Sequence, residues 1–235
     1  MKTVHNQLSA IFNHAVKYYN LRENPARTVG NMGKEKTKEM EFWTKEEYLK
    51  FSESMLKKDG VYQAFEMLYW CGLRLGEMLA LTPADFNFTK GTVRINKSLQ
   101  RLKGRDVITD PKTEKSNRTV QMPNFLVEEM KDYIHRLYGI KRDERIFNIT
   151  KSGMHYEMKR GCKETNVKRI KIHSLRHSHV SLLIEMGFSA LAIANRVGHE
   201  SIEITYRYAH LFPARGQEIA DKLENEREEV FSRVS

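Results

Sequence analysis

Residues 171–213 read KIHSLRHSHVSLLIEMGFSALAIANRVGHESIEITYRYAHLFP, and this stretch decides how the reactive part of the chain folds. Gly187 is followed by Ser189, and Gly198 is followed by Ser201. A glycine that ends a helix and a serine that caps the next one therefore occur twice within a short span. This pattern predicts three short consecutive helices.

Five polar side chains are distributed over these helices in a way that brings them together. The first helix presents His173 and Arg176 around its opening turn, and the second ends just before His199. The third carries Tyr206 and Tyr208. One segment can therefore direct a guanidinium, two imidazoles and a phenol towards one place.

The composition favours a soluble globular protein with a polyanionic partner. With 235 residues, of which 40% are hydrophobic and 30% are charged, the chain can bury one core and a small appendage. Forty Lys and Arg against 30 Asp and Glu give a formal charge of +10, which indicates nucleic acid as the partner.

Cysteine usage and hydropathy indicate a cytoplasmic location. Cys71 and Cys162 lie far apart and form no Cys-x-x-Cys pair, which argues against a disulfide framework and a cysteine zinc site. No apolar run in the sequence approaches the ~20 residues that span a bilayer, and the N-terminus lacks the layout of a signal peptide. We therefore expect a protein of the reducing cytoplasm with no membrane partner.

The N-terminal residues predict one amphipathic helix followed by a linker. Apolar residues recur at three- and four-residue steps and predict one buried face, formed by Val4, Leu8, Ile11, Phe12, Ala15 and Val16. Asn24-Pro25 then breaks the helix. Residues 1–29 are too short to fold alone, so we expect them to pack on the rest or to end another domain. Residues 30–41 are rich in glycine and charge, which is typical of a linker.

Helical patterns dominate the rest of the chain. Thr44 is predicted as an N-cap, with Glu46 and Glu47 in the first turn of a helix that runs to about Lys58. Further helical patterns begin near residues 61, 74 and 124, and another ends near residue 165. A short strand-like segment, RIFNI, precedes this last helix.

Arg74 lies among apolar residues at the start of a core-packed helix. A buried arginine is costly unless it is paired or directed at an anion, and Glu77 is placed three residues later, where it can support Arg74. Two interpretations stay open at this point. One is an anion-directed Arg74 that Glu77 supports, and the other is an ordinary surface ion pair.

Residues 91–122 change to the periodicity of strands. The β-branched runs TVRIN, DVIT and RTVQM are separated by glycine and polar turns, which predicts three antiparallel strands. The predicted fold class is therefore mainly α with a small three-stranded antiparallel β-sheet. Lys112 follows a proline in the loop between the second and third strands, where it either forms a solvated hairpin tip or contacts a phosphate.

Positive charge is concentrated in two segments. Residues 90–118 carry nine basic against three acidic residues, and residues 159–176 carry seven against one, so each has a net charge of +6. The remainder is slightly acidic, and we expect one DNA-binding face. Its candidate contacts are Arg101, Lys103, Arg105, Lys115, Arg118, Lys168, Arg169 and Lys171. The acidic and amphipathic residues 213–235 predict a terminal helix that docks elsewhere.

This combination of side chains suits phosphoryl transfer by a protein nucleophile. Arg74 and Arg176 can bind the non-bridging oxygens of a phosphodiester, where negative charge grows in the transition state. Lys112 can protonate the departing 5′ oxygen. Histidines can bind the same phosphate or assist proton movement at Tyr208.

A zinc site is the competing interpretation of the histidines. His173 and His177 are spaced i, i+4, and His179 is close in sequence. No metalloprotease-like Glu accompanies them, and we therefore expect no metal.

Five motifs are arranged along the chain in a recognisable order. They are GLRLGEMLAL (72–81), PKTEKSNRTV (111–120), HSLRHSH (173–179), GHES (198–201) and YRYAH (206–210). In order and spacing they resemble the tyrosine recombinases, the phage integrase family. The PKT-x-x-S-x-R-T loop is most similar to integrases of Gram-positive integrative elements and temperate phages.

The resemblance implies a domain organisation. Residues 42–212 resemble the catalytic domain, and residues 1–29 resemble the C-terminal remnant of the family's core-binding (SAM-like) domain, joined by the linker at 30–41. Residues 213–235 would form a helical tail that docks on a neighbouring protomer.

The resemblance also implies an active site. The matching catalytic positions are Arg74, Lys112, His173, Arg176, His199 and Tyr208, with Glu77 behind Arg74. Tyr208 has the family's spacing of nine residues from His199. Residues two positions apart on a helix point in directions about 200° apart, so Tyr206 and Tyr208 cannot both face one phosphate. We therefore expect Tyr206 to be a packing residue.

In function, the resemblance implies a site-specific DNA recombinase that cleaves and rejoins strands through a 3′-phosphotyrosyl intermediate. It would integrate or excise a mobile element or prophage, and it would need no cofactor because bond energy is conserved. Its partners would be double-stranded attachment or core sites, a homotetramer on DNA, and an excisionase or host DNA-bending protein. A non-catalytic DNA-binding regulator and a type IB topoisomerase-like relaxing enzyme stay open as alternatives.

Overall fold

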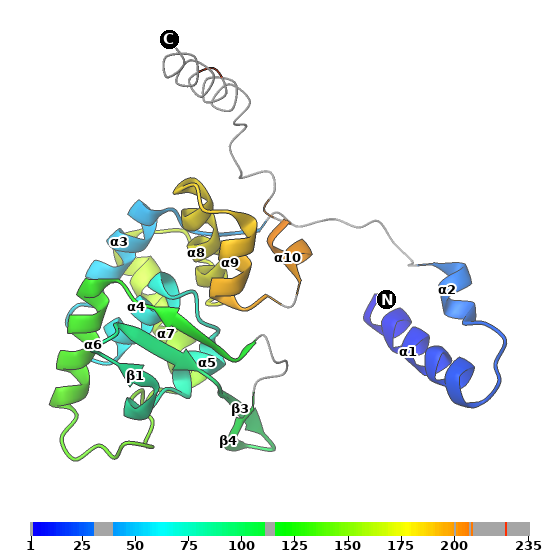
Figure 1. The fold of residues 1–235 in the computed structure, drawn as a ribbon, viewed down its shortest axis with the longest axis horizontal. Coiled ribbons are helices and arrows are strands. Elements are labelled where there is room, and N and C mark those ends of the chain that lie inside the picture. Colours follow the sequence, from blue (N-terminus) through cyan, green and yellow to red (C-terminus); the bar gives the residue numbers. More distant parts are fainter. Residues whose placement is uncertain are drawn as a thin grey trace, which may run out of the picture. The chain divides into compact units, whose positions relative to one another are not determined.

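The computed structural model describes residues 2–30, 40–110, 116–199 and 201–206, together with residues 208 and 224. The chain forms two compact units, Met1–Glu39 and Met40–Ser235. Figure 1 shows the first unit as two helices and the second as a helical body around a small sheet.

The first unit contains α1 (Lys2–Tyr18) and α2 (Pro25–Val29). Asn24 caps α2, because its side-chain oxygen accepts a hydrogen bond from the Ala26 N–H (2.9 Å). The Asn24 amide donates to Asn13 Oδ1 of α1 (2.8 Å). α1 thus ends at Tyr18, before the predicted break, and Asn24-Pro25 begin α2 and hold it against α1.

The apolar stripe of α1 is not buried within this unit. Val4, Leu8 and Ile11 are 58%, 45% and 63% exposed. The five-residue α2 is too short to cover them. Within the first unit this face therefore stays uncovered, because amphipathic periodicity marks a face without supplying the surface that covers it. That residues 1–29 pack on the rest of the protein or end another domain stays a prediction.

Helices are the main regular structure in the described part of the second unit. Thr44 begins the first of them with a capping box, since the Thr44 hydroxyl accepts from the Glu47 N–H (3.3 Å) and the Glu47 carboxylate accepts from the Thr44 N–H (2.9 Å). The predicted start is confirmed, and the helix ends at Glu53, earlier than Lys58. The described helices are α3 (Lys45–Glu53), α4 (Val61–Trp70), α5 (Leu75–Leu79), the 3-10 turn η1 (Pro83–Asp85), α6 (Asn124–Arg136), α7 (Lys151–Thr165), α8 (Ser174–Glu185), α9 (Ala190–Val197) and α10 (Ile202–Tyr206).

An antiparallel three-stranded sheet lies against these helices, in the order β1-β2-β5. Its strands are β1 (Phe86–Asn87), β2 (Thr92–Ile95) and β5 (Arg118–Gln121). Val93 of β2 is opposite Val120 of β5. Both valines are buried and alternate with exposed residues, which gives the sheet one face towards the core. The predicted fold class, mainly α with a small three-stranded antiparallel sheet, is confirmed.

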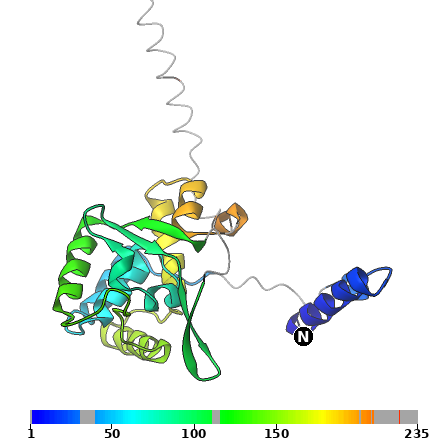
Figure 2. The same cartoon turned by 60° about the horizontal axis from the view of Figure 1, so that its bottom comes forward.

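The membership of this sheet differs from the prediction. The DVIT run lies in β4 (Arg105–Thr109), which pairs with β3 (Ser98–Leu102) in a separate hairpin. Figure 2 shows this hairpin extending away from the helical body. Val107 and Ile108 are exposed, so β4 has no apolar face for the core. The short β1 takes the predicted place of β4 in the sheet, and RIFNI forms no strand.

The hydrophobic core forms around α4, which contacts α3, α5, α6 and α8. Tyr48 of α3 stacks on Tyr69 of α4 with ring centroids 3.6 Å apart. The Trp43 N–H donates to Ser178 Oγ of α8 (2.8 Å) and fastens the chain before α3 to that helix. α5 and α8 therefore both pack on α4, and both helices carry predicted site residues.

Gly161 of α7 tests the packing of this helix on α3. A Cβ at residue 161 would lie 2.3 Å from Met55 Cε and 2.6 Å from Phe51 Cε2. We expect Gly161→Val to lower the free energy of unfolding by roughly 1–3 kcal/mol, because overpacking forces core side chains from their rotamers. Lys163→Val, at an exposed position of the same helix, is the control. Urea denaturation measures both, and equal stability of the two variants would contradict this packing.

Candidate active site

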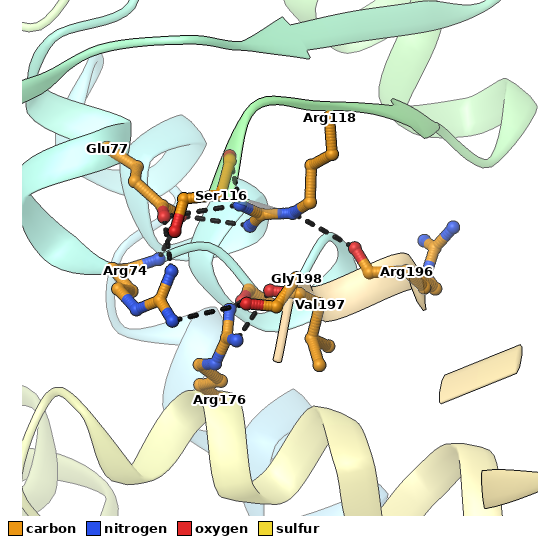
Figure 3. Close-up of polar contacts among 9 residues, drawn as sticks. Arg74, Glu77, Ser116, Arg118, Arg176, Arg196, Val197 and Gly198 are labelled. Carbon is orange, nitrogen blue, oxygen red and sulfur yellow. Dashed lines mark hydrogen bonds and ion pairs between the residues drawn. The ribbon is translucent and has the colours of Figure 1, made fainter. Parts of the chain in front are cut away.

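The C-terminal end of α9 is the point at which three arginines meet. Gly198 ends α9 in the left-handed conformation (φ 67°, ψ 55°), as the sequence predicted. The carbonyls of residues 196, 197 and 198 accept hydrogen bonds from Arg118 (3.1 Å), Arg176 and Arg74 (3.4 Å), respectively. Figure 3 shows the three guanidinium groups around this turn. The partial negative charge at the end of a helix favours such cations.

Glu77 links two of these arginines. Its carboxylate accepts from the Arg74 N–H (2.9 Å) and from Arg74 Nη1 (2.7 Å) at the start of α5. It also accepts from Arg118 Nη2 (2.9 Å) and Nη1 (3.2 Å). Burial raises the pKa of Glu77, but the hydrogen bonds and charges of Arg118 and Arg74 outweigh burial and lower it to about 2. The predicted Arg74–Glu77 contact is present. Because Glu77 is buried, the contact is not an ordinary surface ion pair.

Arg118 faces inwards, towards Glu77 and the end of α9, and its predicted contact with DNA stays a prediction. Its guanidinium is buried and also donates to the Ser116 carbonyl (3.2 Å). A count of basic residues cannot separate an inward arginine from an outward one. The strand period could have done so, because Arg118 shares a face with the buried Val120 two residues later.

Arg176 is buried on α8. Its Nη1 donates to the Gly72 carbonyl (2.9 Å), in the turn before α5. Burial, followed by the charges of Arg74 and Arg118, lowers the pKa of Arg176 to about 9. The three guanidinium groups repel one another, and the carboxylate of Glu77 contacts two of them. A bound anion would relieve this repulsion, so the cluster favours phosphate.

Two of the predicted histidines lie beside these arginines. His173 immediately precedes α8, is exposed, and has a pKa lowered by desolvation, by Arg176 and by Arg74. His199 is buried, and its Nδ1 is hydrogen-bonded with Thr205 Oγ1 (2.8 Å). Burial and the charges of Arg176 and Arg74 lower the pKa of His199 to about 3. His199 is therefore neutral at neutral pH.

Tyr208 is 2% exposed and packs in a small apolar cluster that joins α8 to α9. Its N–H donates to the Thr205 carbonyl (3.0 Å), and its hydroxyl is hydrogen-bonded with His177 Nδ1. The three predicted helices are present as α8, α9 and α10, but Tyr208 lies in a turn beyond the end of α10.

Tyr206 is the last residue of α10 and is 54% exposed. The expectation that Tyr206 is a packing residue is therefore wrong. The argument from helical rotation does not apply to this pair, because α10 ends at Tyr206 and Tyr208 lies in the turn that follows.

The remaining basic candidates divide into three groups. Those on the hairpin are exposed, namely Arg101, Lys103 and Arg105, with Arg101 3.6 Å from Asp106. Those before α8 are also exposed, namely Lys168, Arg169 and Lys171, with Lys168 3.1 Å from Glu47. Lys112 and Lys115 lie outside the described residues.

The described residues contain neither a candidate metal site nor a membrane-spanning helix. Within them, no group of three or more His, Cys, Asp or Glu side chains is arranged to hold a metal ion. His179 is buried and its Nε2 accepts from Arg196 Nε (3.1 Å), which makes it a structural imidazole. No helix in this described part has the length and apolar character to cross a membrane.

The sequence matches known proteins over most of its length. The family model described as "Phage integrase family" matches residues 41–215. The "ICEBs1 integrase" of Bacillus subtilis (strain 168) is 34% identical over 242 residues, which cover 95% of this chain and 66% of that protein. The "Integrase" of Staphylococcus phage L54a is 26% identical and covers 90% of this chain and 70% of that protein. The chain thus spans about two thirds of the length of such relatives.

Solved structures share the fold. The integrase of the Tn1549 transposon, in complex with transposon right end DNA, aligns with a TM-score of 0.73 at 20% identity, covering 95% of this chain and 78% of that chain. The XerA recombinase aligns with a TM-score of 0.61 at 18% identity, covering 94% of this chain and 76% of that chain.

Glu77→Gln tests the electrostatic role of the buried carboxylate. The pKa of Glu77 is about 2, below the ordinary 4.5, so ionised Glu77 stabilises the fold above about pH 5 and loses this effect as the pH falls towards 2. At neutral pH we expect the substitution to cost about 3–5 kcal/mol, because Arg118 is left buried without its partner charge.

Thermal or urea unfolding from pH 7 to pH 2 measures this effect. The unfolding free energy of wild type should fall more steeply below pH 5 than that of Glu77→Gln, and Glu53→Gln, at an exposed position of α3, should follow wild type. Parallel curves for wild type and Glu77→Gln would contradict the assignment.

Proposed function

Because the chain belongs to the phage integrase family, we propose that it is a site-specific tyrosine recombinase. It cleaves and rejoins double-stranded DNA through a 3′-phosphotyrosyl intermediate, and it integrates or excises a mobile element or prophage. It acts in the cytoplasm. The similarity to integrases of a Bacillus element and a Staphylococcus phage supports the assignment to mobile DNA.

The observation that carries this proposal is the convergence of Arg74 and Arg176 on the end of α9. His199 directly follows this end, and the charges of both arginines lower its pKa, as they lower that of His173. Tyr208 packs against the same α8–α9 pair. Adjacent elements thereby hold two arginines that can bind a phosphodiester and a phenol that can attack it.

The chemistry follows from these roles. The oxygen of Tyr208 attacks the scissile phosphorus, and Arg74 and Arg176 stabilise the charge that grows on the non-bridging oxygens. Lys112 protonates the departing 5′ oxygen. The 5′ hydroxyl of the partner duplex then attacks the phosphotyrosine, so each broken ester is replaced by a new one and the exchange needs no external energy source.

We also propose how this recombinase assembles on DNA and which partners it uses. The working unit is a homotetramer on two core sites, and residues 213–235 dock on a neighbouring protomer. Residues 1–29 are the end of a core-binding domain, and an excisionase or host DNA-bending protein assists. The DNA complex of the Tn1549 transposon integrase supports DNA as the substrate class.

Tyr208→Phe should abolish covalent attachment to DNA while leaving DNA binding unchanged, because it removes the attacking oxygen and keeps the ring. A nicked suicide duplex carrying the attachment sequence, incubated with protein in EDTA, gives a denaturing-gel band shifted by the protein's mass. The band should be present with wild type and with Tyr206→Phe, the matched control. Covalent complex that persists in Tyr208→Phe would refute the assignment.

This assay, together with a relaxation assay on a supercoiled plasmid, separates the alternatives. A non-catalytic regulator would give no shifted band with wild type on its native site. A topoisomerase-like enzyme would relax supercoiled DNA that lacks any attachment sequence.

The exposed hairpin residues Lys103 and Arg105 are proposed to contact DNA phosphates. Substituting both with Ala should weaken duplex binding at every sequence and lower the dependence of log K on log salt by roughly 2, because about one counterion is released per phosphate contact. Fluorescence anisotropy over a salt series measures this slope. Lys131→Ala, at an exposed position of α6 outside both basic clusters, should leave the salt dependence unchanged. An equal loss in that control would contradict a specific hairpin contact.

A further inference from the structure

His177 follows Arg176 on α8 and is half-buried beside Tyr208. Its Nδ1 is hydrogen-bonded with the Tyr208 hydroxyl, and the two ring centroids are 5.8 Å apart. Resting on the proposed function, we propose that His177 accepts the proton of the Tyr208 hydroxyl as this oxygen attacks the scissile phosphate. His177 thereby becomes a catalytic residue in addition to those the family resemblance implies.

The geometry places an acceptor where one is needed. Tyr208 is 2% exposed, so bulk water has little access to its hydroxyl in this state. Phenols have a pKa of about 10 in water and need a proton acceptor to become good nucleophiles at neutral pH. Among the histidines in the described part of the chain, His177 is the one whose ring nitrogen is hydrogen-bonded with this hydroxyl. His199 Nδ1 is hydrogen-bonded with Thr205, and His173 is exposed.

The surroundings keep His177 unprotonated before DNA binds. Desolvation, followed by the nearby His173 and Arg176, lowers the pKa of His177 to about 4. At pH 7 the imidazole is therefore neutral. The proposal requires the tautomer that carries its proton on Nε2, in which Nδ1 has a free lone pair and accepts the hydrogen bond of the Tyr208 hydroxyl.

The base becomes stronger when the substrate arrives. The titratable and charged groups that face His177 are His173 and Arg176 of its own region, His199 after α9, and Tyr208. A phosphodiester bound by Arg176 brings a negative charge that offsets the guanidinium. The pKa of His177 then rises at the step that requires proton transfer.

The proton and electron balance is complete. As the Tyr208 Oη–phosphorus bond forms, the Oη proton passes to His177 Nδ1, and the phosphorus–O5′ bond breaks as O5′ takes a proton from Lys112, the general acid of the proposed function. In strand joining, the 5′ hydroxyl of the partner duplex attacks the phosphorus, its proton passes back to Lys112, and the bond between the phosphorus and the tyrosine oxygen breaks. Protonated His177 then returns its proton to that oxygen.

The test compares His177→Gln and His177→Phe with wild type and with His135→Gln, an exposed histidine of α6. The full chain is mixed in excess with the nicked attachment-site duplex, and the single-turnover rate of covalent attachment is measured from pH 7 to pH 9. Gln can accept the hydrogen bond of the phenol but cannot take its proton, so it separates proton transfer from positioning. Anisotropy and thermal unfolding confirm binding and folding, and the Gln variant decides the result where Phe fails to fold.

We expect both His177 variants to bind the duplex like wild type and to react about 10²–10³-fold more slowly at pH 7, the usual contribution of general base catalysis. Their rates should rise roughly tenfold per pH unit, as the phenolate fraction does, and His135→Gln should match wild type. A His177→Gln rate near wild type, or a slow rate that stays flat with pH, would overturn the proposal for His177 alone. Absence of covalent complex with wild type on its native site would overturn the proposed function as well.

Discussion

Mutual repulsion among Arg74, Arg118 and Arg176 is the constraint that shapes the candidate site. Guanidinium groups are held close together only where negative charge compensates them, and here Glu77 and the carbonyls that end α9 supply it. The compensation is incomplete: burial lowers the pKa of Arg176 most, and the charges of Arg74 and Arg118 lower it further. A preorganised excess of positive charge of this kind favours a phosphate and the additional charge of its transition state.

The same contacts connect the elements of the fold to one another. Arg118 ties β5 to α5 and α9, and Arg176 ties α8 to the turn before α5 and to α9. In the proposed reaction, a phosphate with full negative charge competes with the partial charges of the carbonyls for Arg74 and Arg176. The protein contacts therefore hold the arginines in position, and the substrate completes their neutralisation.

Local signals explain which features could be predicted from the sequence. The capping box at Thr44, the glycines that end α8 and α9, and the Arg74–Glu77 contact all depend on residues a few positions apart. The motif series supplied the family, and the family model confirms it.

Features that depend on distant partners could not be predicted in the same way. The pairing of β4 with β3, the inward direction of Arg118, and the burial of Tyr208 in place of Tyr206 are set by tertiary packing. Arg118 was predicted as a DNA contact from the number of basic residues in its segment. The alternation of buried and exposed residues along β5 contained the signal for its burial. The contact of His177 with Tyr208 joins residues on two separate elements, and their spacing in the sequence does not predict that the two side chains meet.

Peptide mapping of the covalent protein–DNA complex tests the central claim most directly. After nuclease and protease digestion, mass spectrometry identifies the residue that retains a nucleotide. The account predicts the modification on Tyr208, in the peptide that follows α10. A nucleotide on Tyr206, or on any residue away from the arginine cluster at the end of α9, would contradict it.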